Sequence, residues 1–300
     1  MESLKIPDHS SWRNLRSSDG TNLFCREWET PAQAKGTILM LPGLGEHTGR
    51  YIHVGNFFQK AGFNVLGIDV RGQGRSGGRP AQVDRYDQFL EDVRAAIHIV
   101  NVSPLFVLGH SFGGQLSLAL AARDEPNIAG YVVSGPWLAL TKPPTSWLLG
   151  VASLLNVLYP NCRFPTGIER GHNSSDEAHL DSLADLDLNH KFITVRAFFE
   201  IAGEARRLLS NPRANAPVLI AQGRPDPVTS VEASIEFYQR LEAPAKELII
   251  YEGFLHELHN EKDRARVLED YLSWIEKTML LAKASAEPGP VQKNTVKSER

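Results

Sequence analysis

Two hydrophobic patterns alternate along the first 135 residues. Short, continuous apolar runs are typical of strands buried on both faces, and they occupy 37–41, 63–68, 105–108 and 128–133. Apolar residues at spacings of three and four predict helices over 51–61, 84–100 and 112–122. The segments 12–17 and 22–28 flank Ser18-Asp19-Gly20-Thr21, which predicts an opening hairpin. This order predicts an α/β fold with a mostly parallel central sheet and helices on both faces.

The alternation stops near residue 135 and returns at 218–221, with a helix at 231–241, a strand at 247–251 and a helix at 261–282. The interval contains helical patterns at 145–158, 176–183 and 192–209. Because the insertion is too long for a loop, we expect a helical lid. The predicted division is core at 1–135, lid at 136–212, core at 213–283 and a disordered, Pro/Gly/Lys/Ser-rich tail at 284–300.

Composition narrows the function classes. The chain has 300 residues with 42% hydrophobic content, enough for a sizeable core, and a net charge of −3 that gives no reason to expect nucleic acid. Cys25 and Cys162 form no C-x-x-C pair, so neither a zinc site nor a disulfide framework is expected. The first residues contain no apolar signal region, and the apolar patch at 147–158 is shorter than the roughly 20 residues of a membrane span. We expect a soluble, cytoplasmic protein, and we leave its oligomeric state open.

Residues 109–113 read Gly-His-Ser-Phe-Gly and lie between a predicted strand and a predicted helix. A nucleophile elbow needs this context, because its sharp turn exposes the serine hydroxyl at the end of the strand. The following helix directs its N-terminal dipole towards the site. A chance match is the alternative in a chain with 24 glycines, and partner residues are needed to decide.

Two such partners occur later in the chain. Asp226 follows the strand at 218–221, and His256 follows the strand at 247–251. The carboxyl ends of parallel strands share one edge of a sheet, and the order Ser, Asp, His is that of the elbow fold. We therefore predict a triad in which His256 accepts the proton of Ser111 and Asp226 fixes the imidazole. His259 is the rival base, but it lies three residues further on.

The oxyanion of an acyl-transfer reaction needs backbone N–H donors. One comes from the residue after the nucleophile and one from a loop that follows a strand. Residues 39–47, Leu-Met-Leu-Pro-Gly-Leu-Gly-Glu-His, leave a strand into such a loop. Leu44 and Phe112 are the predicted donors.

Gly72, Gly74 and Gly77 match the dinucleotide fingerprint G-x-G-x-x-G. That motif places its last glycine in the first turn of a helix, where the pyrophosphate meets the helix N-terminus. Here helical periodicity begins only near Asp84, so we expect no dinucleotide and no other cofactor. Asp69 and Arg71 are candidates to hold this loop by local hydrogen bonds.

Taken together, these motifs resemble the α/β-hydrolase family, and within it the monoacylglycerol lipase/lysophospholipase branch. The resemblance extends from about residue 12 to 282 and is carried by the stretches 43–51, 69–77, 109–114, 222–226 and 251–261. It implies the same triad of Ser111, Asp226 and His256 and the same donors, Leu44 and Phe112. Two positions depart from the family pattern. Pro42 stands where the family usually has His, and Gln73 stands at the centre of a usual Gly-His-Gly, which puts the loop geometry and the substrate preference in doubt.

The predicted lid is strongly apolar, and we name Trp137, Trp147, Leu148 and Leu154 as candidate substrate contacts. These residues either form an acyl-chain tunnel, with transient contact to a membrane surface left open, or simply pack the lid onto the core. The resemblance implies a serine hydrolase of single-chain lipid esters, such as monoacylglycerols. The alternatives are an acyl hydrolase of small non-lipid esters and, more remotely, a non-catalytic binding protein of the same fold.

Overall fold

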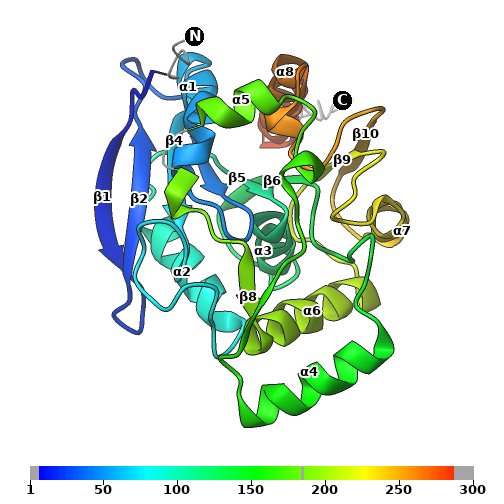
Figure 1. Ribbon diagram of the computed structural model, residues 1–300. Helices are drawn as coiled ribbons and strands as arrows, with labels where there is room; N and C mark the ends of the chain where they lie inside the picture. Colours follow the sequence, from blue (N-terminus) through cyan, green and yellow to red (C-terminus); the bar gives the residue numbers. More distant parts are fainter. Residues whose placement is uncertain (1–6, 184–185, 287–300) are drawn as a thin grey trace, which may run out of the picture.

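The computed structural model describes residues 7–183 and 186–286, built around an eight-stranded sheet (Figure 1). The strand order is β1-β2-β4-β3-β5-β6-β9-β10. The strands are β1 (Ser11–Arg16), β2 (Asn22–Trp28), β3 (Thr37–Leu41), β4 (Asn64–Asp69), β5 (Leu105–His110), β6 (Ile128–Ser134), β9 (Val218–Gly223) and β10 (Lys246–Tyr251). The pairs β1–β2 and β2–β4 are antiparallel and the others are parallel, which confirms the predicted hairpin and the mostly parallel sheet.

Helices cover both faces of the sheet, as predicted. The core helices are α1 (Ile52–Lys60), α2 (Asp87–His98), α3 (Phe112–Ala121), α7 (Val231–Arg240) and α8 (Arg264–Ala286). Alternate residues of β3 point to opposite faces, because successive side chains of a strand do so. Leu39 belongs to the core cluster that contains residues of α2, α3 and α7, whereas Ile38 belongs to the cluster that contains residues of α1 and α8. Every residue of β3 and β5 is therefore buried, which explains their continuous apolar runs.

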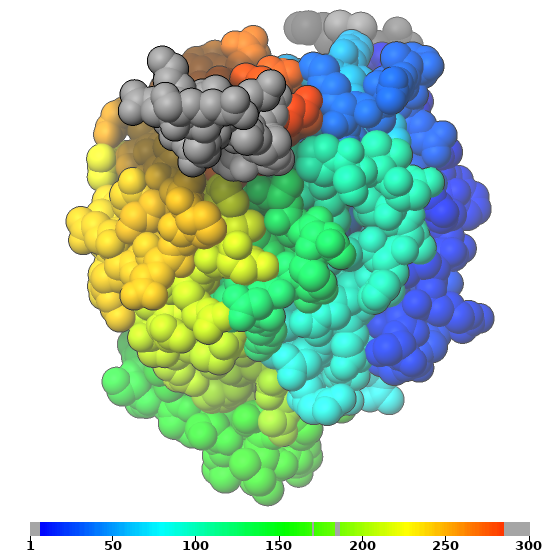
Figure 2. Space-filling model, turned by 180° about the vertical axis from the view of Figure 1, so that it is seen from behind, coloured from blue at the N-terminus to red at the C-terminus, as the bar shows by residue number. Residues whose placement is uncertain are grey.

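The segment between β6 and β9 is less regular. It contains α4 (Ser146–Leu158), β7 (Arg163–Pro165), α5 (Glu177–Ser182), β8 (Phe192–Thr194) and α6 (Val195–Ser210). Two of its helices, α4 and α6, lie at one end of the molecule, whereas α5 lies near α1 at the other end (Figures 1 and 2). Helix α4 lies along α6 and has no buried residue. In contrast, Ile201 of α6 is fully buried beside α3. A lid role for this segment and its boundaries at 136–212 stay predictions, and the word lid is used below only as its name.

The prediction of one helix over 192–209 is wrong at its start. Residues 192–194 form β8, which pairs with β7, a strand that the sequence pattern did not indicate. The side chain of Thr194 caps α6 by accepting a hydrogen bond from the N–H of Ala197 at 3.2 Å, so the helix begins at Val195. Phe192 and Ile193 carry the apolar pattern that resembled the start of the helix.

Helix α8 extends to Ala286, so the first three residues of the predicted tail are helical. Residues 287–300, the rest of that predicted tail, lie outside the described residues. Within the part of the chain that the structure describes, no helix combines the length and the apolar character needed to cross a bilayer.

Two helical glycines should respond in opposite directions to substitution by alanine. A Cβ at Gly55 of α1 would lie 2.3 Å from the Trp28 ring, whereas one at Gly203 of α6 would meet only Arg206, at 4.0 Å. We expect Gly55→Ala to lower the free energy of unfolding by about 1–3 kcal/mol through overpacking. Gly203→Ala should raise it by about 0.5–1 kcal/mol through helix propensity. Urea unfolding of both variants tests this, and equal effects of the two substitutions would contradict the predicted packing.

Candidate active site

Ser111 occupies a strained turn between β5 and α3. Its backbone has φ +54° and ψ −112°, which is unusual for a residue with a side chain. A Cβ at Gly109 would lie 2.2 Å from the carbonyl oxygen of Gly113, and a Cβ at Gly113 would lie 2.1 Å from that of Leu41. Glycine is therefore required two residues before and two residues after Ser111, as the elbow motif predicts.

Asp226 and His256 come from the loops after β9 and β10 and are hydrogen bonded to each other. The distance from Asp226 Oδ2 to His256 Nδ1 is 2.8 Å. Asp226 Oδ1 also accepts from the backbone N–H groups of Val228 and Thr229, at 2.8 and 3.0 Å. Its Oδ2 accepts from Thr229 Oγ1 at 2.9 Å and from Gln222 Nε2 at 2.7 Å. Asp226 is thus oriented from several sides.

The two side chains stabilise each other's charged form. Burial alone would raise the pKa of Asp226, but the hydrogen-bonded His256 holds it below its ordinary value. Burial likewise opposes the charge of His256, yet the adjacent Asp226 carboxylate raises the pKa of the imidazole above 6.5. An imidazole in this setting can take up a proton readily.

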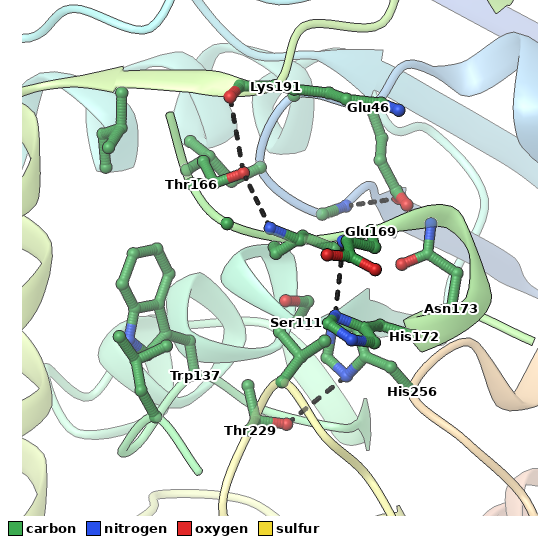
Figure 3. Close-up of a pocket in the computed structure, with 18 of the residues that line it drawn as sticks. Glu46, Ser111, Trp137, Thr166, Glu169, His172, Asn173, Lys191, Thr229 and His256 are labelled. Carbon is green, nitrogen blue, oxygen red and sulfur yellow. Dashed lines mark hydrogen bonds between the residues drawn. The ribbon is translucent and has the colours of Figure 1, made fainter. Parts of the chain in front are cut away.

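Ser111 and His256 line the same cavity (Figure 3). Asp226 does not line it and is bonded to the Nδ1 atom of His256. The structure therefore brings the three predicted residues together at one edge of the sheet. The rival base, His259, does not line this cavity. It is buried and stacks on Tyr51, with 4.6 Å between ring centroids, and burial holds its pKa well below 6.5.

The predicted oxyanion donors are placed on the same side. Leu44 lines the cavity, and Phe112 is the first residue of α3, directly after Ser111. Among the hydrogen bonds of the described residues, none uses the backbone N–H of Leu44 or of Phe112. Both N–H groups thus lack an acceptor within the described residues, as the predicted role requires.

The cavity has a volume of about 630 Å³ and a lining of mixed polarity. Its apolar residues include Trp137, Leu140, Leu148, Phe164, Ile193, Phe198 and Val228. Its polar residues include Glu46, Arg50, Lys142, Thr166, Glu169, His172, Asn173, Lys191 and Glu257. In Figure 3, Trp137 lies on one side of Ser111, here called the apolar end, and Glu46 and Asn173 lie on the other, here called the polar end. The arrangement suits a ligand with an apolar tail and a polar head.

Two of the four candidate substrate contacts line the cavity. Trp137 and Leu148 do so, but Trp147 and Leu154 lie on the outer surface of α4, with 71% and 61% of their surface exposed. The difference arises because α4 turns only one face towards the cavity. Sequence reasoning also missed Glu169, His172 and Asn173, which lie in an irregular part of the lid without a motif.

A buried ionic network borders the polar end of the cavity. Arg50 Nη2 donates to both carboxylate oxygens of Glu257, at 2.8 and 2.7 Å, and Tyr51 donates to Glu46 at 2.6 Å. Burial, aided by Glu46, raises the pKa of Glu257, while Arg50 opposes this rise. The stretch 43–51 was noted in the sequence for its resemblance, but nothing in it indicated this network.

The glycine loop after β4 is held by its own hydrogen bonds. Asp69 accepts from the N–H groups of Thr48 and Arg75, at 2.7 and 3.0 Å. The guanidinium of Arg71 donates to Asp92 through two bonds, of 2.8 and 2.6 Å, and its backbone N–H donates to the same carboxylate at 3.0 Å. The prediction that Asp69 and Arg71 hold the loop is confirmed. Helix α2 begins only at Asp87, so the helix start that a dinucleotide fingerprint requires does not follow Gly77. Within the described residues, no cluster of His, Cys, Asp and Glu is arranged to hold a metal ion.

Comparison with known proteins gives concordant matches. The chain is 29% identical over 261 residues to a monoacylglycerol lipase of Mycolicibacterium smegmatis, covering 85% of this chain and 93% of that protein. It is 30% identical over 278 residues to an uncharacterized abhydrolase domain-containing protein of Dictyostelium discoideum, of which it spans only 30%. The solved structure of a soluble variant of Saccharomyces cerevisiae monoglyceride lipase, in complex with a substrate analog, superposes with a TM-score of 0.79 at 24% identity. That superposition covers 93% of this chain and 99% of that one, and it supports the fold.

The family described as serine aminopeptidase, S33, matches residues 32–263, which include the turn at Ser111 and the loops of Asp226 and His256. The chain therefore belongs to this family and has the α/β-hydrolase fold.

Proposed function

We propose that this serine hydrolase cleaves the carboxylic ester of single-chain lipids such as monoacylglycerols, with Ser111, His256 and Asp226 as its triad. The observation that carries the proposal is the two-ended cavity, in which Ser111 lies between an apolar lining and a polar one. An acyl chain beside Trp137 and Leu148 would place the ester carbonyl at Ser111 and the alcohol at Glu169, His172 and Asn173. The similarity to a bacterial monoacylglycerol lipase supports the same substrate class.

The proposed reaction is a two-step acyl transfer. His256 removes the proton of Ser111 as the hydroxyl oxygen attacks the ester carbonyl, and Asp226 stabilises the imidazolium that forms. The backbone N–H groups of Leu44 and Phe112 bind the oxyanion. His256 then gives its proton to the leaving alcohol. Water attacks the acyl-enzyme with His256 again as base, which releases the fatty acid and restores Ser111.

Substrate selection follows from the shape of the cavity. We expect hydrolysis of monoacylglycerols to exceed that of di- and triacylglycerols, since one apolar end accepts one chain. The rate on p-nitrophenyl esters should rise from acetate to medium-length acyl chains. Ser111→Ala should abolish turnover and burst acylation with an unchanged circular dichroism spectrum. Activity confined to acetate would exclude a lipid substrate, and full turnover by Ser111→Ala would exclude the triad.

The pH dependence should report the pair formed by Asp226 and His256. His256 acts as a base only when neutral, so kcat/KM should rise with pH through its pKa, above 6.5. Asp226→Asn removes the carboxylate that raises the pKa of His256, whereas burial still lowers that pKa. The acid limb of the profile should therefore move to lower pH. The value of kcat should fall by a factor on the order of 10⁴. Asp270→Asn is the control. Asp270 lies on α8 and accepts a hydrogen bond from Tyr251 of β10, so this substitution should leave the limb in place. An unmoved limb in Asp226→Asn would exclude the assigned pair.

Helix α4 carries a continuous apolar outer surface next to the cavity. Its exposed members are Trp147, Leu148, Val151, Leu154, Val157 and Leu158, of which Leu148 also lines the cavity. We propose that this surface contacts the lipid aggregate from which the substrate is drawn. The continuity between the apolar outer face and the apolar end of the cavity supports this route.

Binding to neutral phosphatidylcholine vesicles tests that contact. The double substitution Trp147→Ser with Leu154→Ser should weaken binding by at least about 10-fold, because two side chains no longer bury apolar surface in the lipid. Hydrolysis of a water-soluble short ester should be unchanged. Leu280→Ser is the matched control, since Leu280 is 67% exposed on α8, at the opposite end of the molecule. Equal binding by the double variant and the control would count against the contact.

A further inference from the structure

Residues 42–46 form a loop that is here called the oxyanion loop. Some of its backbone N–H groups bond to acceptors of the protein, and one does not. The N–H of Gly43 donates to Glu46 Oε2 at 3.0 Å, and the N–H of Gly45 donates to Gln73 Oε1 at 2.6 Å. The N–H of Leu44, between them, has no partner among the described residues. The N–H groups on both sides are therefore held by acceptors of the protein, whereas that of Leu44, a residue that lines the cavity, is not.

The direction of the Leu44 N–H is set by the peptide planes around it. This N–H and the Gly43 carbonyl belong to one planar peptide unit and point in opposite directions. The Gly43 carbonyl accepts from the N–H of Glu46 at 3.2 Å, within the loop. The next peptide unit includes the Gly45 N–H, so its orientation depends on the acceptor that Gln73 supplies.

Burial and backbone hydrogen bonds fix the position of Gln73, and with it the position of the acceptor oxygen. Its side chain is buried, with 3% exposed, and it does not line the cavity. Its own N–H donates to the Val70 carbonyl at 3.1 Å, and its carbonyl accepts from Ser76 at 3.0 Å. The neighbouring glycines have φ of +72° and +50°, so the turn that carries Gln73 is one that few other residues can form.

Gly45 is held from the lid as well as from the core. Its carbonyl accepts from the N–H of His190 at 3.1 Å, and a Cβ at this position would lie 2.2 Å from the His190 carbonyl oxygen. With φ at +77°, Gly45 has a conformation that glycine adopts readily. Gly45 is thus fixed by two hydrogen bonds, one from its N–H to Gln73 in the core and one to its carbonyl from His190 in the lid.

We propose that Gln73 is a positioning residue for the reaction: by accepting from Gly45, it orients the peptide that follows Leu44 and keeps the Leu44 N–H directed at the oxyanion. The inference rests on the proposed function, because it concerns the same reaction at Ser111. Gln73 touches no substrate. Its removal should therefore affect the transition state and not the affinity for the ester.

Two substitutions separate the acceptor from the volume of the side chain. Gln73→Met keeps length and shape but lacks a strong acceptor, whereas Gln73→Glu retains an acceptor oxygen. We expect Gln73→Met to lower kcat by about 10- to 100-fold, somewhat less than the loss of a whole oxyanion donor, with KM changed by less than about 2-fold. Gln73→Glu should recover most of kcat.

The rate at which a fluorophosphonate labels Ser111 gives a second readout, because its phosphoryl oxygen also enters the oxyanion hole. Labelling of Gln73→Met should slow in parallel with kcat, and that of Gln73→Glu should recover. Asn64→Leu is the matched control. Asn64 Oδ1 accepts from the N–H of Thr30 at 3.0 Å, at the far end of β4, so this variant loses a similar bond and should label at the wild-type rate.

The outcomes distinguish the positioning role from the proposed function. Wild-type kcat and labelling in Gln73→Met would overturn the role of Gln73, as would a failure of Gln73→Glu to restore the labelling rate. An equal loss in Asn64→Leu would also overturn it, since the effect would then be one of general stability. If the wild-type enzyme hydrolyses no lipid ester, the proposed substrate class fails, and the labelling rates still decide the role of Gln73.

Discussion

The close approach of α3 to the end of β3 is the constraint on which the site depends. At Gly113 the helix backbone comes so near to the Leu41 carbonyl that no side chain fits between them. This contact forces the turn at Ser111 into a conformation that is otherwise unfavourable, and the tightly packed core supplies the energy to hold it. It also brings the start of α3 next to the loop that leaves β3. The proposed nucleophile and both proposed oxyanion donors are therefore placed by one packing contact.

Charge is arranged around His256 in two layers. Asp226 contacts the imidazole directly and accepts hydrogen bonds from four other groups, so it can remain ionised although it is buried. Glu257 and Glu46 lie further away and are paired with Arg50 and Tyr51. A second unpaired carboxylate close to His256 would hold the imidazole in its protonated form. Because Glu257 is paired with Arg50, its effect on the pKa of His256 is reduced. Both side chains still give the cavity a polar surface.

The sequence was sufficient to predict those strands and helices whose hydrophobic residues follow a regular pattern. Buried strands such as 37–41 and 105–108, and the elbow at Ser111, carry local signals that tertiary structure does not override. The strands β7 and β8 were missed because each is three residues long and their pairing joins segments about thirty positions apart. Glu169, His172 and Asn173 were missed for a related reason, since only the path of the lid brings them to the cavity. Gln73 was noticed as a departure from the family pattern, but its partner at Gly45 could not be inferred without the fold. The outer position of Trp147 and Leu154 likewise depends on which face α4 turns to the cavity.

The contact between His190 and Gly45 has a consequence for how this lid can vary among sequences. It is made by a backbone N–H and a backbone carbonyl, so it does not depend on which side chain occupies position 190. Residues that line the cavity from the lid can therefore be exchanged, and the chemical preference of the pocket with them, while the attachment of the lid to the oxyanion loop is preserved. Glycine at position 45 is the fixed requirement, because the lid backbone occupies the space of any larger residue. A glycine at position 45 would then keep the oxyanion loop in contact with the lid backbone, whichever side chains the lid presents to the cavity.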